Sequence, residues 1–530
     1  ATAPSDADNW KAFVQKADLA LYLAKKRGRD QVVDAAEVDA QEAPEKVAFH
    51  QLGSVKMVGR SNQSNKINAA LKQFQKTDNA FVLVKGAPGM GKTSFLEAVK
   101  KSLGRSKIRQ ASARGAPQEM YRPYYLVEQV IVDLLNQRPD KGMALLTGMG
   151  DEALGFLSLV MPGLTGDVKP PEGLDEAQRR KGIFETLVRL FCLIAEDRPL
   201  FLFIDDIVFS DEAALLLIRR LALQDDLKLF VLATASEDPE PVEGKEERPL
   251  DRFLRQYGEE LGLVPVPLTP LKAGDIYQQI RSLFPDITLP KGFCEKLARI
   301  SRGNPLFLSE ILRKMVLDRQ ITLVGQKWTL RPFEKDYLPN SMEEMITEKI
   351  AAFDESSRQL LDRVSAMGEH VPLSTLVGSS SLMEAKVLEF IDQAAAQGLL
   401  ASDFALNEEN IRFLSKQILD ITYNAIEPER KKELHSQIGA YHEDLFKQHR
   451  LPAATLAYHF KRSDDVQKAE RYHRLQSEAN LRNFNAGEAA EYSGKLPSDE
   501  PPEEPPLSSE GLAQVPQLVR SFAVALRNIK

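Results

Sequence analysis

The stretch Ala80-Phe-Val-Leu-Val-Lys-Gly-Ala-Pro-Gly-Met-Gly-Lys-Thr-Ser-Phe-Leu-Glu-Ala-Val-Lys100 decides the fold of this chain. A short apolar run, residues 81–84, leads into a glycine-rich turn, residues 86–91, and then into a segment with helical periodicity. This order predicts a strand, a phosphate-binding loop and a helix. The spacing Gly86-x4-Gly91-Lys92-Thr93 fits the P-loop pattern at every fixed position, and the alternative is a glycine-rich turn that arose by chance.

Each residue type in this loop has a physical role. Glycines let consecutive backbone N–H groups point inward, and the helix N-terminus adds positive potential. We expect Lys92 to reach the terminal phosphates and the Thr93 hydroxyl to ligate Mg²⁺. The residues predicted to contact the nucleotide phosphates are Gly86, Ala87, Pro88, Gly89, Met90, Gly91, Lys92, Thr93 and Ser94.

The second half of the site is predicted at residues 199–206, Pro-Leu-Phe-Leu-Phe-Ile-Asp-Asp. A run of apolar residues too short for a typical helix favours a strand buried on both faces of a parallel sheet. Carboxylates at the C-terminal end of such a strand lie where α/β sheets bind ligands. We assign Asp205 to Mg²⁺ and Asp206 to polarisation of the attacking water, and solvated aspartates at a capped strand end are the alternative.

A further buried strand, residues 227–236, ends in hydroxyl side chains. Thr234 is a candidate hydrogen-bond partner of the water or the γ-phosphate, and it is equally well explained as an ordinary strand-end threonine. Asn304 and Pro305 have the pattern of a helix N-cap followed by proline in the first helical position. Residues 105–180 are predicted to be mainly helical, and no chemical motif stands out there.

Composition places the chain among ordinary globular proteins. Its 530 residues predict about three to five domains, and a net charge of −7 gives no reason to expect a nucleic-acid surface. No apolar run is long enough to span a bilayer, and the N-terminus lacks the layout of a secretory signal. The two cysteines lie in apolar stretches, which favours buried thiols in a reducing, cytoplasmic compartment.

The first residues resemble a different family from the rest. Residues 17–30, Ala-Asp-Leu-Ala-Leu-Tyr-Leu-Ala-Lys-Lys-Arg-Gly-Arg-Asp, are similar to the last helix of GGDEF domains, the diguanylate cyclases of bacteria. The signature that gives this family its name occurs nowhere in the chain. The resemblance therefore implies the end of a cyclase domain without cyclase activity.

Several motifs together resemble the STAND class of signalling ATPases, which are AAA-like nucleotide switches of bacterial regulators. They are the phosphate loop, Leu202-Phe-Ile-Asp-Asp206 with Asp211, the Pro-Leu before Lys272, and Gly303-Asn-Pro-Leu-Phe-Leu308. The resemblance implies an α/β P-loop NTPase with a RecA/AAA-like parallel sheet, a helical lid that carries Asn304 and Pro305, a winged-helix-like domain and a helical TPR-like region. It also implies ATP or ADP with Mg²⁺ as cofactors.

Some positions depart from this family or leave alternatives open. The resemblance places Val58-Gly-Arg60 beside the adenine, and the alternative for Arg60 is a loop arginine without a ligand. Relatives commonly carry an arginine two residues after Thr234, where this chain has Ser236. Because a cation near the γ-phosphate stabilises charge in the transition state, hydrolysis is expected to be slow or to need a donated arginine, while binding survives.

The C-terminal half is predicted to be a helix, a small hairpin and a helix, followed by helices from residue 430 to residue 492. Histidines at 435, 442, 449, 459 and 473 are read as ordinary helix residues rather than metal ligands. The predicted organisation is a cyclase remnant (1–34), linker (35–52), NTPase domain (53–270), helical lid (271–338), winged-helix-like domain (339–427), TPR-like region (428–495), acidic proline-rich linker (496–507) and last helix (508–530).

The sequence thus predicts a slowly hydrolysing nucleotide switch in a multidomain bacterial signalling protein. We expect a protein partner at the C-terminal helices and no membrane, and a homo-oligomer is left open. One alternative is a non-hydrolysing scaffold with bound nucleotide. Another is a winged-helix transcription regulator, against which the acidic balance and the few basic residues in the candidate reading helices argue.

Overall fold

A computed structural model describes most of the chain between residues 57 and 484. The described ranges are 57–103, 108–117, 119, 122–165, 168–196, 198–237, 248–324, 327–332, 337–380, 382–405, 408–447 and 453–484. The predicted cyclase remnant, both predicted linkers and the predicted last helix lie outside these ranges. The described residues fall into two compact units, one formed by 57–60 with 270–345 and the other by 61–269 with 346–484.

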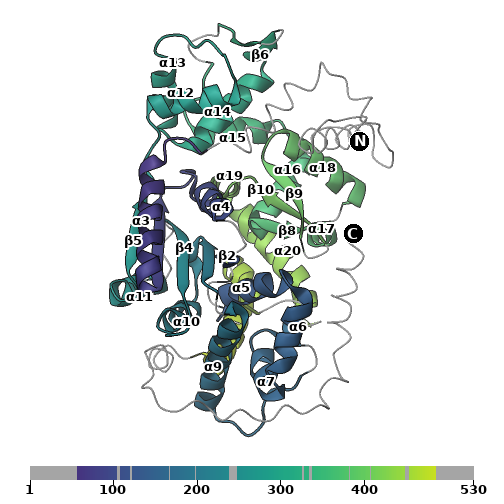
Figure 1. The fold of residues 1–530 in the computed structure, drawn as a ribbon. Coiled ribbons are helices and arrows are strands. Elements are labelled where there is room, and N and C mark those ends of the chain that lie inside the picture. Colours follow the sequence, from purple (N-terminus) through teal and green to yellow (C-terminus); the bar gives the residue numbers. More distant parts are fainter. Residues whose placement is uncertain are drawn as a thin grey trace, which may run out of the picture. The chain divides into compact units, whose positions relative to one another are not determined.

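A five-stranded parallel sheet organises the larger unit (Figure 1). Its strands are β1 (Asn79–Gly86), β2 (Arg109–Arg114), β3 (Leu200–Asp205), β4 (Leu229–Ser236) and β5 (Leu263–Pro267). Their order across the sheet is β2-β3-β4-β1-β5, so β1 and β3 are both neighbours of β4. The strand ends that carry the phosphate loop and the paired aspartates therefore lie on the same edge of the sheet.

Helices cover both faces of this sheet because the central strands β1, β3 and β4 are buried on both faces. Along β3, Leu202 and Ile204 belong to one core and Phe201 and Phe203 to the other. The helices of this part are α3 (Ser61–Thr77), α4 (Lys92–Ser102), α5 (Tyr125–Asn136), α6 (Pro139–Gly148), α7 (Asp151–Ser158), α8 (Pro162–Thr165), α9 (Glu176–Ala195), α10 (Glu212–Ala222) and α11 (Pro249–Tyr257), with a 3₁₀ turn, η2, at Ile207–Phe209. Alternation along the strands thus explains how one short apolar run supplies two cores.

Strand β2 corrects the prediction for residues 105–180, which contain helices but also this edge strand. Its sequence, Arg-Gln-Ala-Ser-Ala-Arg, has no large apolar residue, so hydrophobic periodicity gives no strand signal. Small side chains suffice because Ala111 and Ala113 pack into a core filled mainly by neighbouring helices. The correction matters because the residues after β2 reach the candidate site.

The rest of the larger unit is helical with a small antiparallel sheet. Strands β8 (His370–Pro372), β9 (Leu400–Ala405) and β10 (Glu408–Phe413) pair in the order β8-β10-β9. The helices are α16 (Glu355–Met367), α17 (Leu373–Ser379), α18 (Glu384–Ala396), α19 (Lys416–Asn424), α20 (Pro428–Lys447), α21 (Ala453–Lys461) and α22 (Val466–Asn483). The predicted helix, hairpin and helix correspond to α18, β9 with β10, and α19.

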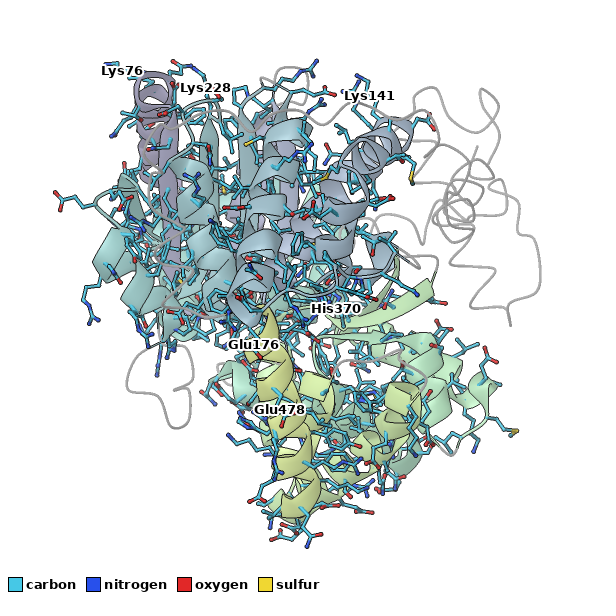
Figure 2. The ribbon with its side chains drawn as sticks, turned by 90° about the horizontal axis from the view of Figure 1, so that it is seen from below. Lys76, Lys141, Glu176, Lys228, His370 and Glu478 are labelled. Atoms are coloured by element: carbon cyan, nitrogen blue, oxygen red, sulfur yellow. The ribbon has the colours of Figure 1, made fainter. Side chains whose placement is uncertain are left out.

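Helix α22 contacts α9 from the first half of the chain. Glu478 of α22 and Glu176, the first residue of α9, are both labelled in Figure 2. Just after α22, the ring of Phe484 meets that of Tyr124 edge to face, with centroids 6.1 Å apart. The last described helix therefore packs on the nucleotide-binding half of the chain.

The smaller unit is a helical subdomain with one hairpin. Its elements are α12 (Ala273–Leu283), α13 (Phe293–Ser301), α14 (Pro305–Leu317), β6 (Ile321–Val324), β7 (Lys327–Leu330) and the start of α15 (Met342–Ala351). Asn304 caps α14 as predicted, because its Oδ1 accepts from Leu306 N at 2.9 Å and Phe307 N at 3.2 Å. In the part of the chain that the structure describes, no helix combines the length and apolar character needed to cross a bilayer.

Candidate functional site

The predicted phosphate loop joins β1 to α4. Gly86 ends the strand, Lys92 begins the helix, and the loop between them includes Gly89 and Gly91 with φ of 78° and 82°. Positive φ of this kind suits glycine, which has no Cβ to clash with the backbone. The carbonyl of Gly91 accepts the first helical hydrogen bond, from Phe95 N at 2.9 Å. The amides of the first turn are left to face a ligand, as in other anion sites at helix N-termini.

Lys92 is buried and folded back onto the loop. Its Nζ donates to the carbonyls of Gly86 at 3.0 Å and Ala87 at 3.3 Å. Burial lowers the pKa of Lys92, while Asp206 and Asp205 act in the opposite direction. The Lys92 ammonium thus has two carbonyl acceptors and two carboxylates nearby, and it can exchange the carbonyls for the more highly charged phosphates of a nucleotide.

Asp205 joins the phosphate loop to β4 through two threonines. Thr93 Oγ1 donates to Asp205 Oδ2 at 2.8 Å, and Thr234 Oγ1 donates to Asp205 Oδ1 at 2.6 Å. Thr234 is buried and also accepts from the backbone N of Asp206 at 2.9 Å. Thr93, Asp205 and Thr234, which are far apart in the sequence, therefore form one hydrogen-bonded group.

Asp206 occupies a left-handed backbone conformation, with φ of 50° and ψ of 47°. Such residues are held only where the surroundings determine them, and aspartate tolerates the region better than most. Gly115 is part of those surroundings, because a Cβ built there would lie 2.2 Å from the Asp206 carbonyl oxygen. Burial raises the pKa of Asp206 and Asp205 adds to the effect, whereas Arg114, Lys416 and Lys92 oppose it.

Arg114, which sequence reasoning missed, lies between the two aspartates and a third carboxylate. Its Nε is 3.6 Å from Asp205 Oδ2, and its Nη2 is 3.6 Å from Asp206 Oδ2 and 2.7 Å from Glu369 Oε1. Burial alone would lower the pKa of Arg114, but Glu369, Asp205 and Asp206 together raise it. What places Arg114 in the site is the register of β2 with β3, because Arg114 pairs with Asp205 in that register.

The C-terminal part of the chain also supplies Lys416, the first residue of α19. Its Nζ lies 4.4 Å from the centre of the Phe209 ring, just beyond the paired aspartates. Its charge lowers the pKa of Asp206 and that of Glu369, both of which burial raises. Glu369 precedes β8 and Lys416 begins α19, so residues 277 and 324 positions after Lys92 reach this edge of the sheet.

Three predicted residues belong to the smaller unit and are described there alone. Arg60 is buried, and burial lowers its pKa while Asp275 raises it. Gly59 is close enough to Asp275 that an added Cβ would lie 2.7 Å from the carboxyl carbon. Asn304 and Pro305 form the start of α14. Their contacts with a nucleotide remain predictions.

The residues of the larger unit fit a magnesium nucleotide. Hydroxyl and carboxylate oxygens, here Thr93 and Asp205, are the ligands that Mg²⁺ prefers. Arg114 Nε is buried and has no hydrogen-bond acceptor among the described residues, so a charged donor stands ready beside them. A site with a helix N-terminus, a lysine, a metal-type oxygen pair and an unsatisfied guanidinium Nε is suited to bind phosphates.

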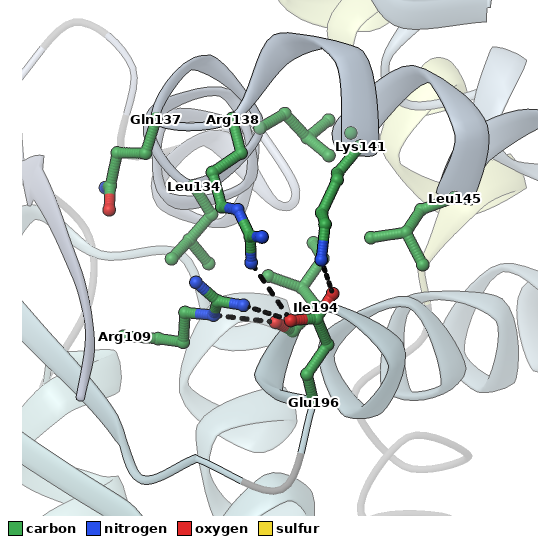
Figure 3. A pocket seen from close by; sticks show the side chains of 10 residues that line it. Arg109, Leu134, Gln137, Arg138, Lys141, Leu145, Ile194 and Glu196 are labelled. Carbon is green, nitrogen blue, oxygen red and sulfur yellow. Dashed lines mark hydrogen bonds and ion pairs between the residues drawn. The ribbon is translucent and has the colours of Figure 1, made fainter. Parts of the chain in front are cut away.

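A second group of charges lies at the opposite end of β2. Glu196 Oε2 accepts from Arg109 and, at 3.1 Å, from Arg138, while Lys141 Nζ is 3.7 Å from Oε1 (Figure 3). Arg109 Nε also has an acceptor, the carbonyl of Ile194 at 3.3 Å. This cluster borders a pocket that Leu134, Leu135 and Leu145 also line. None of the predicted site residues lies in it.

Three histidines meet between α20 and α21. His435 Nδ1 is 2.9 Å from His459 Nδ1, and Tyr423 OH is 2.7 Å from His435 Nε2. The ring of His442 lies 5.3 Å from that of His459, and its buried Nδ1 has no hydrogen-bond partner among the described residues. Burial lowers the pKa of His435 to about 3 and that of His442 to about 4. Over the described ranges, no group of three or more His, Cys, Asp or Glu side chains has an arrangement that could hold a metal ion.

Comparison with protein families supports the assignment of the first half of the chain to the P-loop ATPases. Residues 56–232 match the AAA ATPase domain family, which implies nucleotide binding. Comparison with curated proteins finds no significant match.

Solved structures with similarity include a STAND protein with a tetratricopeptide repeat sensor from Pyrococcus horikoshii, at 16% identity and a TM-score of 0.42. The alignment covers 81% of this chain and 51% of that one, so the chain spans about half the length of that protein. The Aeropyrum pernix ORC1 protein in complex with DNA has 12% identity and a TM-score of 0.31, with 72% and 96% covered. The Thermotoga maritima RuvB Holliday junction branch migration motor has 18% identity and a TM-score of 0.27, with 69% and 95% covered.

Proposed function

We propose that this chain is a nucleotide switch that binds ATP with Mg²⁺ and hydrolyses it slowly. The observation that carries the proposal is the 2.8 Å hydrogen bond between Thr93 and Asp205, which joins the phosphate loop to the strand that ends in paired aspartates. The match to the AAA ATPase domain supports it, and so do the STAND-like motifs of the sequence.

The residues divide the chemistry among them. Backbone N–H groups of the phosphate loop and of the first turn of α4, together with the Lys92 ammonium, would hold the phosphates, and Thr93 and Asp205 would hold Mg²⁺, which supplies charge neutralisation when bound. Asp206, whose pKa burial raises, is positioned to accept a proton from water or to orient it. Ser236 at the end of β4 offers no positive charge, which supports slow turnover.

Regulation would arise because the C-terminal part reaches the same edge of the sheet. Glu369 and Lys416 are within reach of Arg114 and Phe209 there. Only ATP offers a γ-phosphate for differential contacts, so exchange of ATP for ADP can shift these elements. We propose that this shift exposes the C-terminal helices to a protein partner or regulates an attached cyclase domain, to which the resemblance at residues 17–30 points.

Nucleotide binding tests the proposal directly. We expect Lys92→Ala to weaken ATP binding in the presence of Mg²⁺ by about 10- to 100-fold, since hydrogen bonds to charged groups contribute about 1.5–3 kcal/mol. Isothermal titration calorimetry measures the affinity, and Lys76→Ala, on the exposed end of α3, is the matched control. Normal ATP affinity in Lys92→Ala would count against the proposal.

A non-hydrolysing scaffold is the second candidate, and Ser236 favours it. Single-turnover hydrolysis of labelled ATP separates the two functions, because a scaffold shows no hydrolysis above that of Asp206→Asn. The transcription-regulator alternative has less support, since Lys416 is the sole basic residue of α19 and its ammonium faces the Phe209 ring. Salt-dependent DNA binding would favour that alternative.

A further inference from the structure

We infer that Arg114 is the cation that serves the terminal phosphate of the nucleotide, and that Glu369 competes with that phosphate for it. This inference rests on the proposed function and goes beyond it, because it assigns a role to two residues outside every motif of the sequence. It also identifies the group that favours ATP over ADP.

The backbone of Arg114 is fixed from both sides. Its N donates to Gln129 Oε1 at 3.1 Å, and Gln129 Nε2 donates back to its carbonyl at 3.0 Å. The next residue, Gly115, donates its N to the Asp205 carbonyl at 2.9 Å. A side chain of α5 and the backbone of β3 thus hold the guanidinium beside both aspartates.

The guanidinium itself is incompletely satisfied. It lies 3.6 Å from each aspartate, which is an ion-pair distance but too long for a hydrogen bond. Its buried Nε lacks an acceptor within the described part of the chain. Buried charged donors are normally hydrogen-bonded, so an unsatisfied Nε at a phosphate-type site indicates a place for an anionic oxygen.

Within the described ranges, Glu369 supplies the one short contact of this guanidinium to a carboxylate. Its Oε1 lies 2.7 Å from Arg114 Nη2, and the neighbouring His370 Nε2 lies 3.4 Å from Nη1. Thr93 and Asp205 would hold Mg²⁺, so the charge of Asp205 would be shared between the metal and Arg114, and the guanidinium would keep capacity for the phosphate. A γ-phosphate close to Glu369 would add like-charge repulsion, so the triphosphate and Glu369 cannot both be paired optimally with Arg114.

ADP lacks the γ-phosphate and would leave the Arg114–Glu369 pair in place. The identity of the nucleotide would therefore decide whether the segment that begins β8 is held at this edge of the sheet. Because Ser236 brings no charge to β4, Arg114 is the residue best placed to replace the missing cation.

Affinities for a non-hydrolysable β,γ-imido analogue of ATP and for ADP, measured by calorimetry on the whole chain with Mg²⁺, test the inference. We expect Arg114→Gln to weaken analogue binding at least 10-fold and ADP binding less than 3-fold. Arg114→Lys should recover part of the loss. Glu369→Gln should raise the analogue-to-ADP affinity ratio at least 3-fold, because it removes the competing charge.

Glu176→Gln is the matched control, since it removes an exposed carboxylate paired with Arg180 at the start of α9. Equal losses for both nucleotides in Arg114→Gln, or an unchanged ratio in Glu369→Gln, would overturn the inference. If Arg114→Gln does not fold, as judged by circular dichroism, the ratio in Glu369→Gln decides alone. A wild-type chain that binds neither nucleotide would instead refute the proposed function.

Discussion

The two ends of strand β2 each carry an arginine among carboxylates, and the two arginines are paired very differently. At the start, Arg109 has acceptors for both Nε and Nη2, from Ile194 and Glu196. At the end, Arg114 Nη2 has a 2.7 Å contact with Glu369 Oε1, but both aspartates are 3.6 Å away and the buried Nε has no acceptor among the described residues. A satisfied cluster stabilises a fold, whereas an unsatisfied one marks a place where a ligand completes the contacts.

This contrast predicts the largest effect at the unsatisfied end. We expect Asp206→Asn to slow single-turnover ATP hydrolysis by about 100-fold or more, because proton transfer by a positioned side chain typically contributes 10²–10⁴-fold. ATP binding should be retained. An unchanged rate would show that Asp206 takes no part in the chemistry.

The close backbone approach behind Asp206 gives the next effect. Gly115→Ala should destabilise the fold by about 2–3 kcal/mol, because the added methyl group would lie 2.2 Å from a backbone oxygen. Gly148→Ala is the control, since nothing lies within 4 Å of a Cβ built there. Urea denaturation measures both variants. If Gly115→Ala is as stable as the Gly148→Ala control, the backbone at Asp206 can move away from the added methyl group at no cost.

The histidine cluster is a second place where a buried nitrogen, His442 Nδ1, has no hydrogen-bond partner among the described residues. Because the folded pKa values of His435 and His442 are lowered to about 3 and about 4, the unfolded chain binds protons that the folded chain does not. Their contribution to stability is complete above pH 6.5 and is lost as the pH falls below it. We expect a loss of about 1.4 kcal/mol per histidine for each pH unit below 6.5.

Denaturation curves at pH 7.0 and pH 5.5 measure this loss. His442→Gln should make the dependence on pH less steep, because it removes one of the groups that titrate only in the unfolded chain. An identical slope in this variant would show that His442 is not buried in the neutral form.

The smallest effect belongs to the satisfied end of β2. Glu196→Gln should cost about 1 kcal/mol or less, since partly exposed ion pairs contribute little. The affinity for ATP should stay unchanged. A loss of nucleotide binding would mean that the two ends of β2 are coupled through the sheet.

Sequence reasoning predicted those residues of the candidate site that have local signatures. The phosphate loop and the paired aspartates follow apolar runs, and the structure places Thr93 and Asp205 within hydrogen-bond distance. The parallel sheet, the helices on both of its faces and the cap at Asn304 also follow from local patterns.

The remaining residues have no such signature. Arg114 is the last residue of a strand without large apolar side chains, and only the register of β2 with β3 brings it opposite Asp205. Glu369 and Lys416 come from elements far along the chain, so only tertiary packing brings them to the site. Periodicity reports which face of an element is buried, but it carries no information on which distant residues meet there.

The packing of α22 on α9 has a practical consequence for dissection of this chain. A fragment that ends after the NTPase sheet, or even after α19, would lack α22. The face of α9 that α22 covers would then be exposed to water. Tyr124 would also lose its ring contact with Phe484. The backbone N of the same Tyr124 donates to Asp211 at 3.0 Å. We therefore expect a fragment limited to the family match, residues 56–232, to be poorly soluble and prone to aggregation. A fragment that keeps residues through 484 should be more soluble.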